Sequence, residues 1–263
     1  MPYPRDCTML LSIITFLIMP FALCAAAFDA QCGWDAHMSD SQISGRNTRR
    51  LIDISVAIHP ESPSWEKSDG LGEYRELVER QDQGGLAFVS KVNLVVHTTT
   101  HFDAPSHFLQ EAFDSGRGIE AMDLSIMNGP ALVVEVPHDR NITAEVLSTL
   151  SIPSGTERLL FKTVSSAKKL MYHTPFLTNY TALTETGSDW VVQHGIKFVG
   201  IDYVSIATYE ELTAAHQSLM RVGTGIVEGL DLSHVEPGLY DVHCLPLKLH
   251  GSEGAPGRCI LLD

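Results

Sequence analysis

A short segment rich in metal-ligand residues places the strongest limit on how this chain can fold. His97, His101, Asp103 and His107 all have odd numbers, so in an extended segment their side chains share one face. Four extended residues span about 13 Å, whereas a metal ion binds imidazole nitrogens at about 2 Å, so His97 and His101 reach one ion only if the chain bends between them. We therefore predict a strand that ends near His97, a bend over residues 98–100, and an irregular segment after it.

The residue types in this segment indicate a catalytic metal site. Two histidines and one aspartate leave coordination positions open for water and substrate, whereas structural sites are usually closed by four protein ligands. Nitrogen and oxygen ligands together suit Zn²⁺ or Mn²⁺ and do not distinguish them. The alternative is a set of ordinary packed or exposed histidines, which the density of ligand-type residues here argues against. The segment has neither the His-Glu-x-x-His motif of zincin proteases nor the His-x-His spacing of cupins.

The composition is that of a folded globular protein with an acidic surface. Of the 263 residues, 44% are hydrophobic and 19% are charged. The formal net charge is −14, so the surface repels nucleic-acid phosphates and anionic lipid headgroups. We therefore expect no nucleic-acid partner and no attraction to a membrane surface.

The N-terminal residues are typical of a secretory signal peptide. Arg5 precedes an almost wholly apolar run over residues 9–24, and Ala25–Ala27 offers a small-residue cleavage site. The run is short for a membrane span of about 20 residues, although an uncleaved signal anchor is the alternative. We predict a signal peptide over residues 1–27, a polar arm over residues 28–50, one globular domain over residues 51–263, and secretion without a membrane span.

Two further features fit an extracellular compartment. Asn141 and Asn179 each begin an Asn-x-Thr acceptor for N-glycosylation. Signal cleavage would leave Cys32, Cys244 and Cys259, an odd number, so at least one stays free or pairs between chains. Cys244 and Cys259 flank a Gly/Pro-rich turn, which makes a bridge between them geometrically feasible.

Apolar runs punctuated by Gly and Pro predict several strands and fewer helices. The predicted strands cover residues 51–58, 88–96, 131–136, 158–163 and 197–202. Helices are predicted from Thr143, over residues 189–194, and over residues 209–220, where Thr208 and Glu211 form a capping-box pattern. This order predicts a mixed α/β domain with a curved or barrel-like sheet.

The segment around His101 resembles the His-x-Gly-Thr-His-x-Asp-x-Pro-x-His signature of the cyclase family of metal-dependent hydrolases, which includes kynurenine formamidase and isatin hydrolase. The similarity extends over most of residues 50–263 and is closest to the secreted plant cyclase-like proteins. The stretches that carry it are MNGPALVVEVP from Met127, NITAEVL from Asn141, GIDYVSIATYEEL from Gly200 and VEPGLYDVHCLPLKL from Val235. The resemblance implies a swivelling β/β/α fold, hydrolysis of a linear or cyclic amide, and a place in the extracellular matrix.

The resemblance also implies roles for particular residues. His97, His101 and Asp103 would bind a divalent metal, and His107 would be the catalytic acid/base. In two-metal relatives Asp103 would bridge to a second ion held by His216 and Glu228, so one or two ions are expected. The residues alone would favour a helix-face histidine at 216 and a solvated carboxylate at 228.

The resemblance also has implications for the substrate and the activity. The substrate would be a small-molecule amide, and Trp65 either lines its pocket or only anchors a loop. By analogy, a dimer or tetramer is expected. Thr99 stands where the family has Gly; if that position needs a positive φ, a β-branched residue is strained there. The alternative function is therefore an extracellular matrix or regulatory protein that retains the fold with little or no turnover.

Overall fold

The computed structural model describes residues 49–263. The predicted signal peptide, nearly all of the predicted polar arm and Cys32 lie outside these residues. Residues 49–263 belong to one compact unit.

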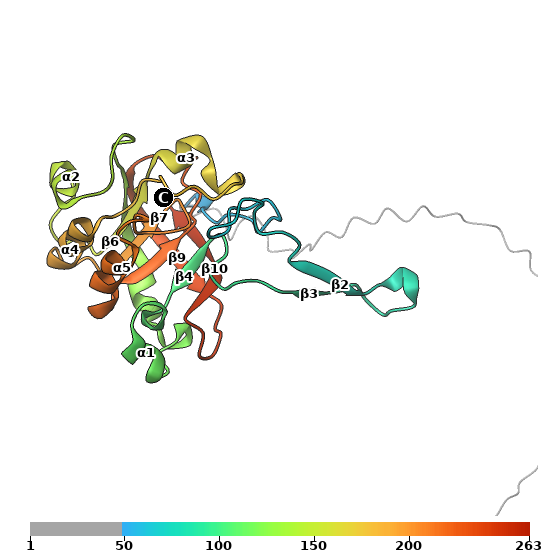
Figure 1. Cartoon of the computed structure of the whole chain (residues 1–263). Coiled ribbons are helices and arrows are strands. Elements are labelled where there is room, and N and C mark those ends of the chain that lie inside the picture. Colours follow the sequence, from blue (N-terminus) through green and yellow to red (C-terminus); the bar gives the residue numbers. More distant parts are fainter. Residues whose placement is uncertain (1–48) are drawn as a thin grey trace, which may run out of the picture. The chain divides into compact units, whose positions relative to one another are not determined.

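A mixed β-sheet that closes on itself forms the centre of this unit (Figure 1). The strand order is β1-β10-β4-β8-β7-β6-β5-β9, and β9 pairs again with β10, so every strand of this sheet except β1 belongs to a closed ring. Strands β5, β6, β7 and β8 run parallel, and the remaining pairs are antiparallel. The strands are β1 (Leu51–Asp53), β4 (His101–Asp103), β5 (Asn128–Glu135), β6 (Arg158–Lys162), β7 (Phe198–Ile201), β8 (Gly225–Glu228), β9 (Gly238–Pro246) and β10 (Gly254–Leu262). The expected mixed α/β domain with a barrel-like sheet is confirmed.

Short helices connect the parallel strands and cover part of the barrel, with α2, α4 and α5 on one side of it (Figure 1). The helices are α1 (Gln110–Asp114), α2 (Ala144–Thr149), α3 (Val164–Lys168), α4 (Glu185–Gln193) and α5 (Leu212–Arg221), with short 3₁₀ turns such as η3 (Pro105–His107). None of the helices among residues 49–263 is long and apolar enough to cross a membrane.

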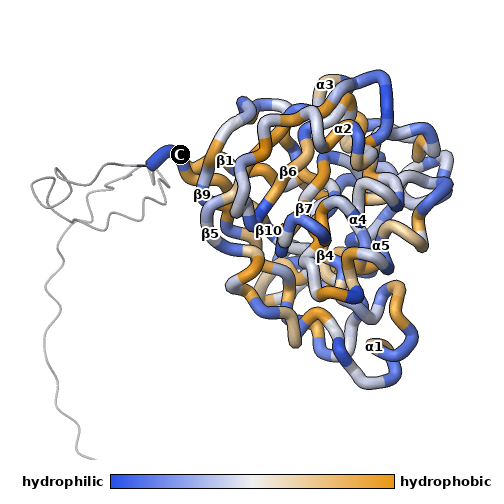
Figure 2. Tube along the Cα trace, turned by 90° about the vertical axis from the view of Figure 1, so that its left-hand side faces the viewer, coloured by the Kyte–Doolittle hydropathy of each residue, from blue (hydrophilic) through white to orange (hydrophobic). Residues whose placement is uncertain are grey.

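Successive side chains along the strands point alternately to the two faces of the sheet, so the core has one part under the helices and one inside the barrel. In β6, Leu159 and Phe161 pack under the helices, whereas Leu160 points into the barrel interior. In β7, Val199 and Ile201 face the helices and Phe198 faces the interior. Both faces are buried, which explains why these strands are continuous apolar runs, coloured orange in Figure 2.

The observed strands differ from the predicted ones. Of the predicted strand 51–58, only Leu51–Asp53 forms a strand, β1. The run 88–96 contains only β3 (Val89–Val92), which pairs with β2 (Arg75–Glu79) in a separate two-stranded ribbon. Conversely, β4 is a regular strand where an irregular segment was expected, because it is hydrogen-bonded to β10 on one side and β8 on the other. Local sequence does not contain this information, since both partners lie more than a hundred residues away in the chain.

Two predicted helices begin elsewhere. Helix α4 begins earlier than predicted, because Thr184 caps it by accepting a hydrogen bond from the backbone N–H of Gly187. Helix α5 begins at Leu212, later than the capping-box pattern predicted. The carboxylate of Glu211 accepts a bond from the backbone of Glu185 instead, and so does not close the box.

A disulfide joins Cys244 of β9 to Cys259 of β10. The two residues are direct cross-strand partners with their Cα atoms 4.2 Å apart. The bridge lies in the barrel interior, where both residues are fully buried. It therefore reinforces the pairing that closes the barrel.

Candidate metal centre

The predicted bend between His97 and His101 is confirmed. Residues 96–100 form a bend, and Thr99 has a φ of 52°, in the left-handed region. The hydroxyl of Thr100 holds the bend by donating to the carbonyl of Gly229 at 2.6 Å and accepting from the backbone N–H of Val56 at 2.8 Å. A Cβ at Gly229 would lie 2.0 Å from the carbonyl oxygen of Thr99, so only glycine allows this close approach.

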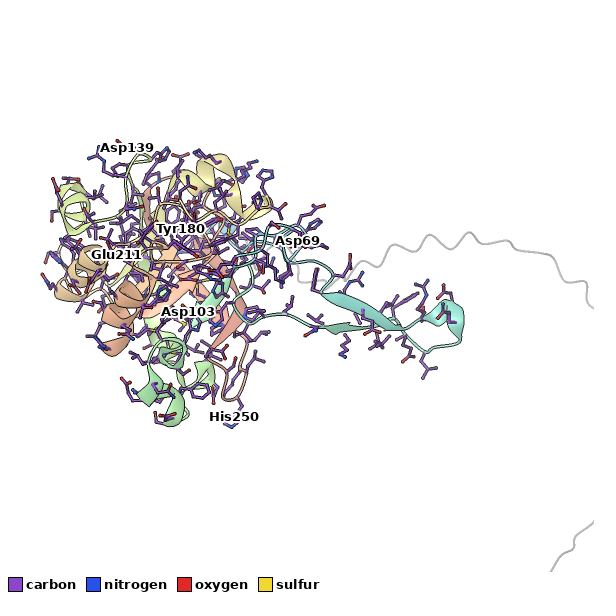
Figure 3. The ribbon with its side chains drawn as sticks, viewed as in Figure 1. Asp69, Asp103, Asp139, Tyr180, Glu211 and His250 are labelled. Atoms are coloured by element: carbon purple, nitrogen blue, oxygen red, sulfur yellow. A yellow bond between two sulfur atoms is a disulfide. The ribbon has the colours of Figure 1, made fainter. Side chains whose placement is uncertain are left out.

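Asp103 is the centre of the cluster that this bend assembles. Its Oδ1 lies 2.9 Å from Nδ1 of His97 and 3.7 Å from Nε2 of His101. Its Oδ2 lies 3.5 Å from Nε2 of His216, which is on α5. Asp103 is buried within the barrel body, whereas Asp139 and His250 lie at the edges of the view in Figure 3.

Glu228 closes the cluster from the end of β8, directly opposite His101 in the β4–β8 pairing. Its Oε2 lies 3.1 Å from Nε2 of His101. Its Oε1 lies 3.2 Å from Nε2 of His216 and accepts a hydrogen bond from the backbone N–H of Ile206 at 2.6 Å. The carboxylate is buried, so it is not the solvated group that the residue type alone would suggest.

Backbone carbonyls set the orientation of two histidine rings. Nδ1 of His101 faces the carbonyl of Thr99 at 3.0 Å, and Nδ1 of His216 faces the carbonyl of Leu212 at 2.7 Å. Since a carbonyl only accepts, each Nδ1 carries a proton, and each Nε2 faces the carboxylates. A cation bound between them would therefore meet the Nε2 lone pair of a neutral ring. This arrangement is typical of metal-binding histidines.

The ionisation of the cluster follows from burial and charge. Burial alone would lower the pKa of His216, but hydrogen bonds and charge from Asp103 and Glu228 raise that pKa to about 10. Burial alone would raise the pKa of Asp103, but the nearby rings of His216 and His97 hold that pKa well below its ordinary value. The carboxylates are therefore anionic and require a cation, which protons on the histidines supply when no metal is bound.

The residues present fit a divalent cation. Ligands about 2.0–2.2 Å from one ion lie roughly 3–3.5 Å from each other, and the nitrogen–oxygen distances here run from 2.9 to 3.7 Å. Within residues 49–263, Oδ2 of Asp103 is buried without a hydrogen-bond partner. Two groups of potential ligands share Asp103: His97 with His107, and His101 with Glu228. The grouping differs from the family-based one, in which His97 and His101 share an ion.

His107 lies on the turn η3, where its ring stacks on that of His97 at 3.8 Å between centroids. Burial lowers the pKa of His107 to about 4, since nearby carboxylates offset burial only in part. The ring is therefore neutral at pH 7 and able to accept a proton.

A cavity of about 270 Å³ opens above the cluster. Trp65 lines it while packing on Phe176 at 4.8 Å and Tyr209 at 5.7 Å, so it is both a pocket wall and a loop anchor. Sequence reasoning missed Phe108, whose ring stacks on His216 at 4.2 Å; its place next to His107 was the only available signal. The lining residues are Pro63, Trp65, Val95, His97, His101, His107, Phe108, Val204, Ser205, Leu212, His216 and Glu228.

The structure thus brings all six predicted metal and catalytic residues together, with Trp65 at the pocket above them. The two predicted glycosylation residues, Asn141 and Asn179, are exposed. Their modification stays a prediction.

Comparison with known proteins identifies the family of this chain. The Cyclase family model matches residues 52–208. Cyclase-like protein 2 of Arabidopsis thaliana is 44% identical over 216 residues, covering 81% of this chain and 79% of the relative. Kynurenine formamidase of Geobacillus thermodenitrificans is 32% identical over 219 residues, covering 80% and 96%.

Solved structures share the fold. A predicted metal-dependent hydrolase from Bacillus stearothermophilus matches with a TM-score of 0.67 at 27% identity, covering 81% of this chain and 98% of that one. Isatin hydrolase A from Labrenzia aggregata matches with a TM-score of 0.68 at 20% identity, covering 84% and 97%. From its family match and its relatives, this chain belongs to the cyclase family.

Proposed function

We propose that this chain is a secreted metal-dependent hydrolase that cleaves a linear or cyclic amide bond with activated water. The observation that carries the proposal is the buried Asp103-centred cluster at the floor of a pocket with aromatic walls. Relatives named kynurenine formamidase and structural neighbours named isatin hydrolase support amide chemistry.

His97, His101, Asp103, His216 and Glu228 would hold one or two ions of Zn²⁺ or Mn²⁺. Such an ion supplies a Lewis acid that polarises the substrate carbonyl and lowers the pKa of water. The chain contributes the rest: carboxylates that are already ionised, and histidines whose Nε2 atoms are already aimed. Pre-set ligands reduce the reorganisation needed when the ion binds.

His107 is the proposed acid/base. Because it is neutral at pH 7, one of its ring nitrogens can take the proton from attacking water and pass it to the leaving nitrogen. Stacking on the His97 ring holds the His107 ring beside the carboxylate cluster.

The pocket suits a small, uncharged aromatic amide. Trp65 and Phe108 supply flat apolar walls, and a cavity of about 270 Å³ holds little more than one or two rings. The described lining contains no Lys or Arg to pair with a substrate carboxylate, while Glu228 would repel one. We therefore expect isatin to be a better substrate than the zwitterionic N-formylkynurenine.

The proposal is tested by measuring metal content by mass spectrometry, followed by hydrolysis of both compounds. Wild type should retain zinc or manganese and hydrolyse at least one of them. His101→Ala should lose metal and activity with its fold intact, whereas the control His173→Ala, at an exposed histidine, should lose neither. Unchanged metal stoichiometry in His101→Ala would refute the site.

The second candidate function is a matrix or regulatory protein that keeps the metal but has little turnover. The left-handed conformation of the β-branched Thr99, beside the first ligands, favours it. Full metal occupancy without hydrolysis across an amide panel would support this function over the enzyme.

Secretion is supported by the signal-like N-terminal sequence and by the Cys244–Cys259 disulfide, a bond typical of oxidising compartments. Expression of the whole chain in a eukaryotic cell should release it into the medium, cleaved near Ala27. Asn141→Gln and Asn179→Gln should each remove a glycosidase-sensitive mass. Retention in cells with an intact N-terminus would indicate the uncleaved anchor instead.

We further propose that the chain self-associates through the ribbon of β2 and β3, which extends from the body in Figure 1. A two-stranded ribbon is marginal alone. Charges within residues 75–92 balance, so two copies of a chain with net charge −14 can approach there with least repulsion. Of the 16 exposed large hydrophobic residues within residues 49–263, six lie on or beside it: Val78, Leu86, Phe88, Val89, Val92 and Val95.

Light scattering during size-exclusion chromatography tests the ribbon. Phe88→Asp should shift the wild-type oligomer toward monomer, whereas Leu124→Asp, at an exposed leucine away from the ribbon, should not. A monomeric wild type would refute self-association.

A further inference from the structure

The loop that leads into β10 lies against the metal site and contains none of the proposed ligands. The backbone N–H of Ala104 donates to the carbonyl of Glu253 at 2.8 Å, and Gly254 is the cross-strand partner of Asp103. Glu253 and Gly254 are therefore fixed beside the strand that carries the central carboxylate.

Gly254 makes room for the ring of His97. A Cβ at this position would lie 2.5 Å from Cε1 and 3.0 Å from Nε2 of that ring, and 2.8 Å from the carbonyl oxygen of Phe102. The backbone oxygen cannot move without disturbing β4. Any larger residue would therefore displace the ring or part β10 from β4.

Glu253 is the acceptor nearest to the far side of the same ring. Its Oε1 lies 3.6 Å from Nε2 of His97, slightly beyond hydrogen-bond distance. That Nε2 is buried and has no hydrogen-bond partner within residues 49–263. The Glu253 side chain is 39% exposed, so a small rotation can bring Oε1 within hydrogen-bond distance of Nε2 of His97.

The proton position on His97 decides whether this histidine can bind a cation. A neutral imidazole carries one N–H and one lone pair. If Nδ1 held the proton, it would donate to Asp103 at 2.9 Å, and the Nε2 lone pair would face a carboxylate. If Nε2 holds the proton, it donates to Glu253, and the Nδ1 lone pair points to the cluster.

We propose that Glu253 and Gly254 form a cradle that positions His97, with the Glu253 carboxylate holding the Nε2 proton so that Nδ1 is available to a divalent ion. Glu253 is a positioning residue, since it acts through His97. The inference rests on the proposed metal site. A carboxylate behind a ligating histidine commonly contributes 10–100-fold, roughly, to metal affinity.

The test measures affinity for Zn²⁺ and Mn²⁺ by competition with a chromophoric chelator, using metal-stripped full-length protein. Glu253→Ala should weaken binding by about 10–100-fold, and Glu253→Gln less, because its amide oxygen still accepts from Nε2–H. The metal-free melting temperature should not change in either variant. Gly254→Ala should weaken binding as well, and Glu236→Ala, at an exposed glutamate outside the pocket lining, is the control.

The outcomes separate this inference from the proposed function. Wild-type affinity in Glu253→Ala, or an equal loss in Glu236→Ala, would overturn the cradle and leave the metal site standing. A wild type that binds neither ion would overturn both. Recovery of affinity in Glu253→Gln relative to Glu253→Ala would support an acceptor at Nε2 over a general charge effect.

Discussion

Replacement of Glu228 by alanine should reveal how strongly the fold depends on its own metal-binding groups. In the metal-free protein this carboxylate accepts from the backbone of Ile206 at 2.6 Å and contacts His101 at 3.1 Å and His216 at 3.2 Å. Removal of one partner from a buried ion pair costs about 3–5 kcal/mol. Of this, the stranded Ile206 N–H accounts for about 1–3 kcal/mol.

Glu228→Gln is the matched comparison. Its side-chain carbonyl can still accept from Ile206, so it should retain the share of stability that this bond supplies. Urea unfolding at pH 7 in a chelator gives both free energies. The wild type should then gain about 2.7 kcal/mol when metal is added at a hundred times its dissociation constant, and Glu228→Ala should gain less at the same concentration.

A loss of less than about 1 kcal/mol for Glu228→Ala in the chelator would refute this prediction, because removing a hydrogen-bonded buried carboxylate costs more than that. It also fails if the variant and wild type gain equally from metal, since Glu228 would then not be a ligand.

Three further predictions follow from the same region and the barrel. Thr99→Gly should change the free energy of unfolding by less than about 1 kcal/mol, because relief of about 1–2 kcal/mol of left-handed strain offsets about 0.4–1 kcal/mol of added unfolded-state entropy. Thr100→Gly should cost more, because it removes the hydrogen-bond partner of two buried backbone groups. Calorimetry on both variants checks this. The pKa of His107 is lowered from 6.5 to about 4, so the unfolded chain binds its proton first and metal-free stability should fall as pH drops from 6.5 toward 4 by up to about 3 kcal/mol, with a smaller fall in His107→Gln. Replacing both Cys244 and Cys259 by serine, which opens a loop of sequence separation 15, should cost about 3 kcal/mol in urea unfolding; a loss near zero would contradict a disulfide in the folded protein.

Part of the site could be predicted from local sequence. The odd spacing of His97, His101 and Asp103 and the limited reach of four residues were enough to predict the bend. His216 and Glu228 could be named only through family resemblance, because the residues themselves suggest a helix face and a solvated carboxylate. His216 and Glu228 become potential metal ligands because they are buried against β4, and this burial depends on pairing between segments that are distant in the sequence.

The closed sheet was predictable as a class but not in its order. Apolar runs such as residues 158–162 and 198–201 indicate buried strands, yet nothing in them states that β10 pairs with both β9 and β4. Glu253 had no sequence signal at all, since its place beside His97 follows from that same pairing.

Strand β4 is only three residues long, but it is paired with β8 on one side and β10 on the other in the closed ring. Because strands flank it on both sides, we expect its backbone amides to exchange with solvent about as slowly as those of the most protected strands of the barrel. The pocket rim, by contrast, comes from loops outside the ring, around Trp65 and Val95. His101, Asp103 and Glu228 are thus fixed by paired strands, whereas the rim can change shape without unpairing any strand of the barrel.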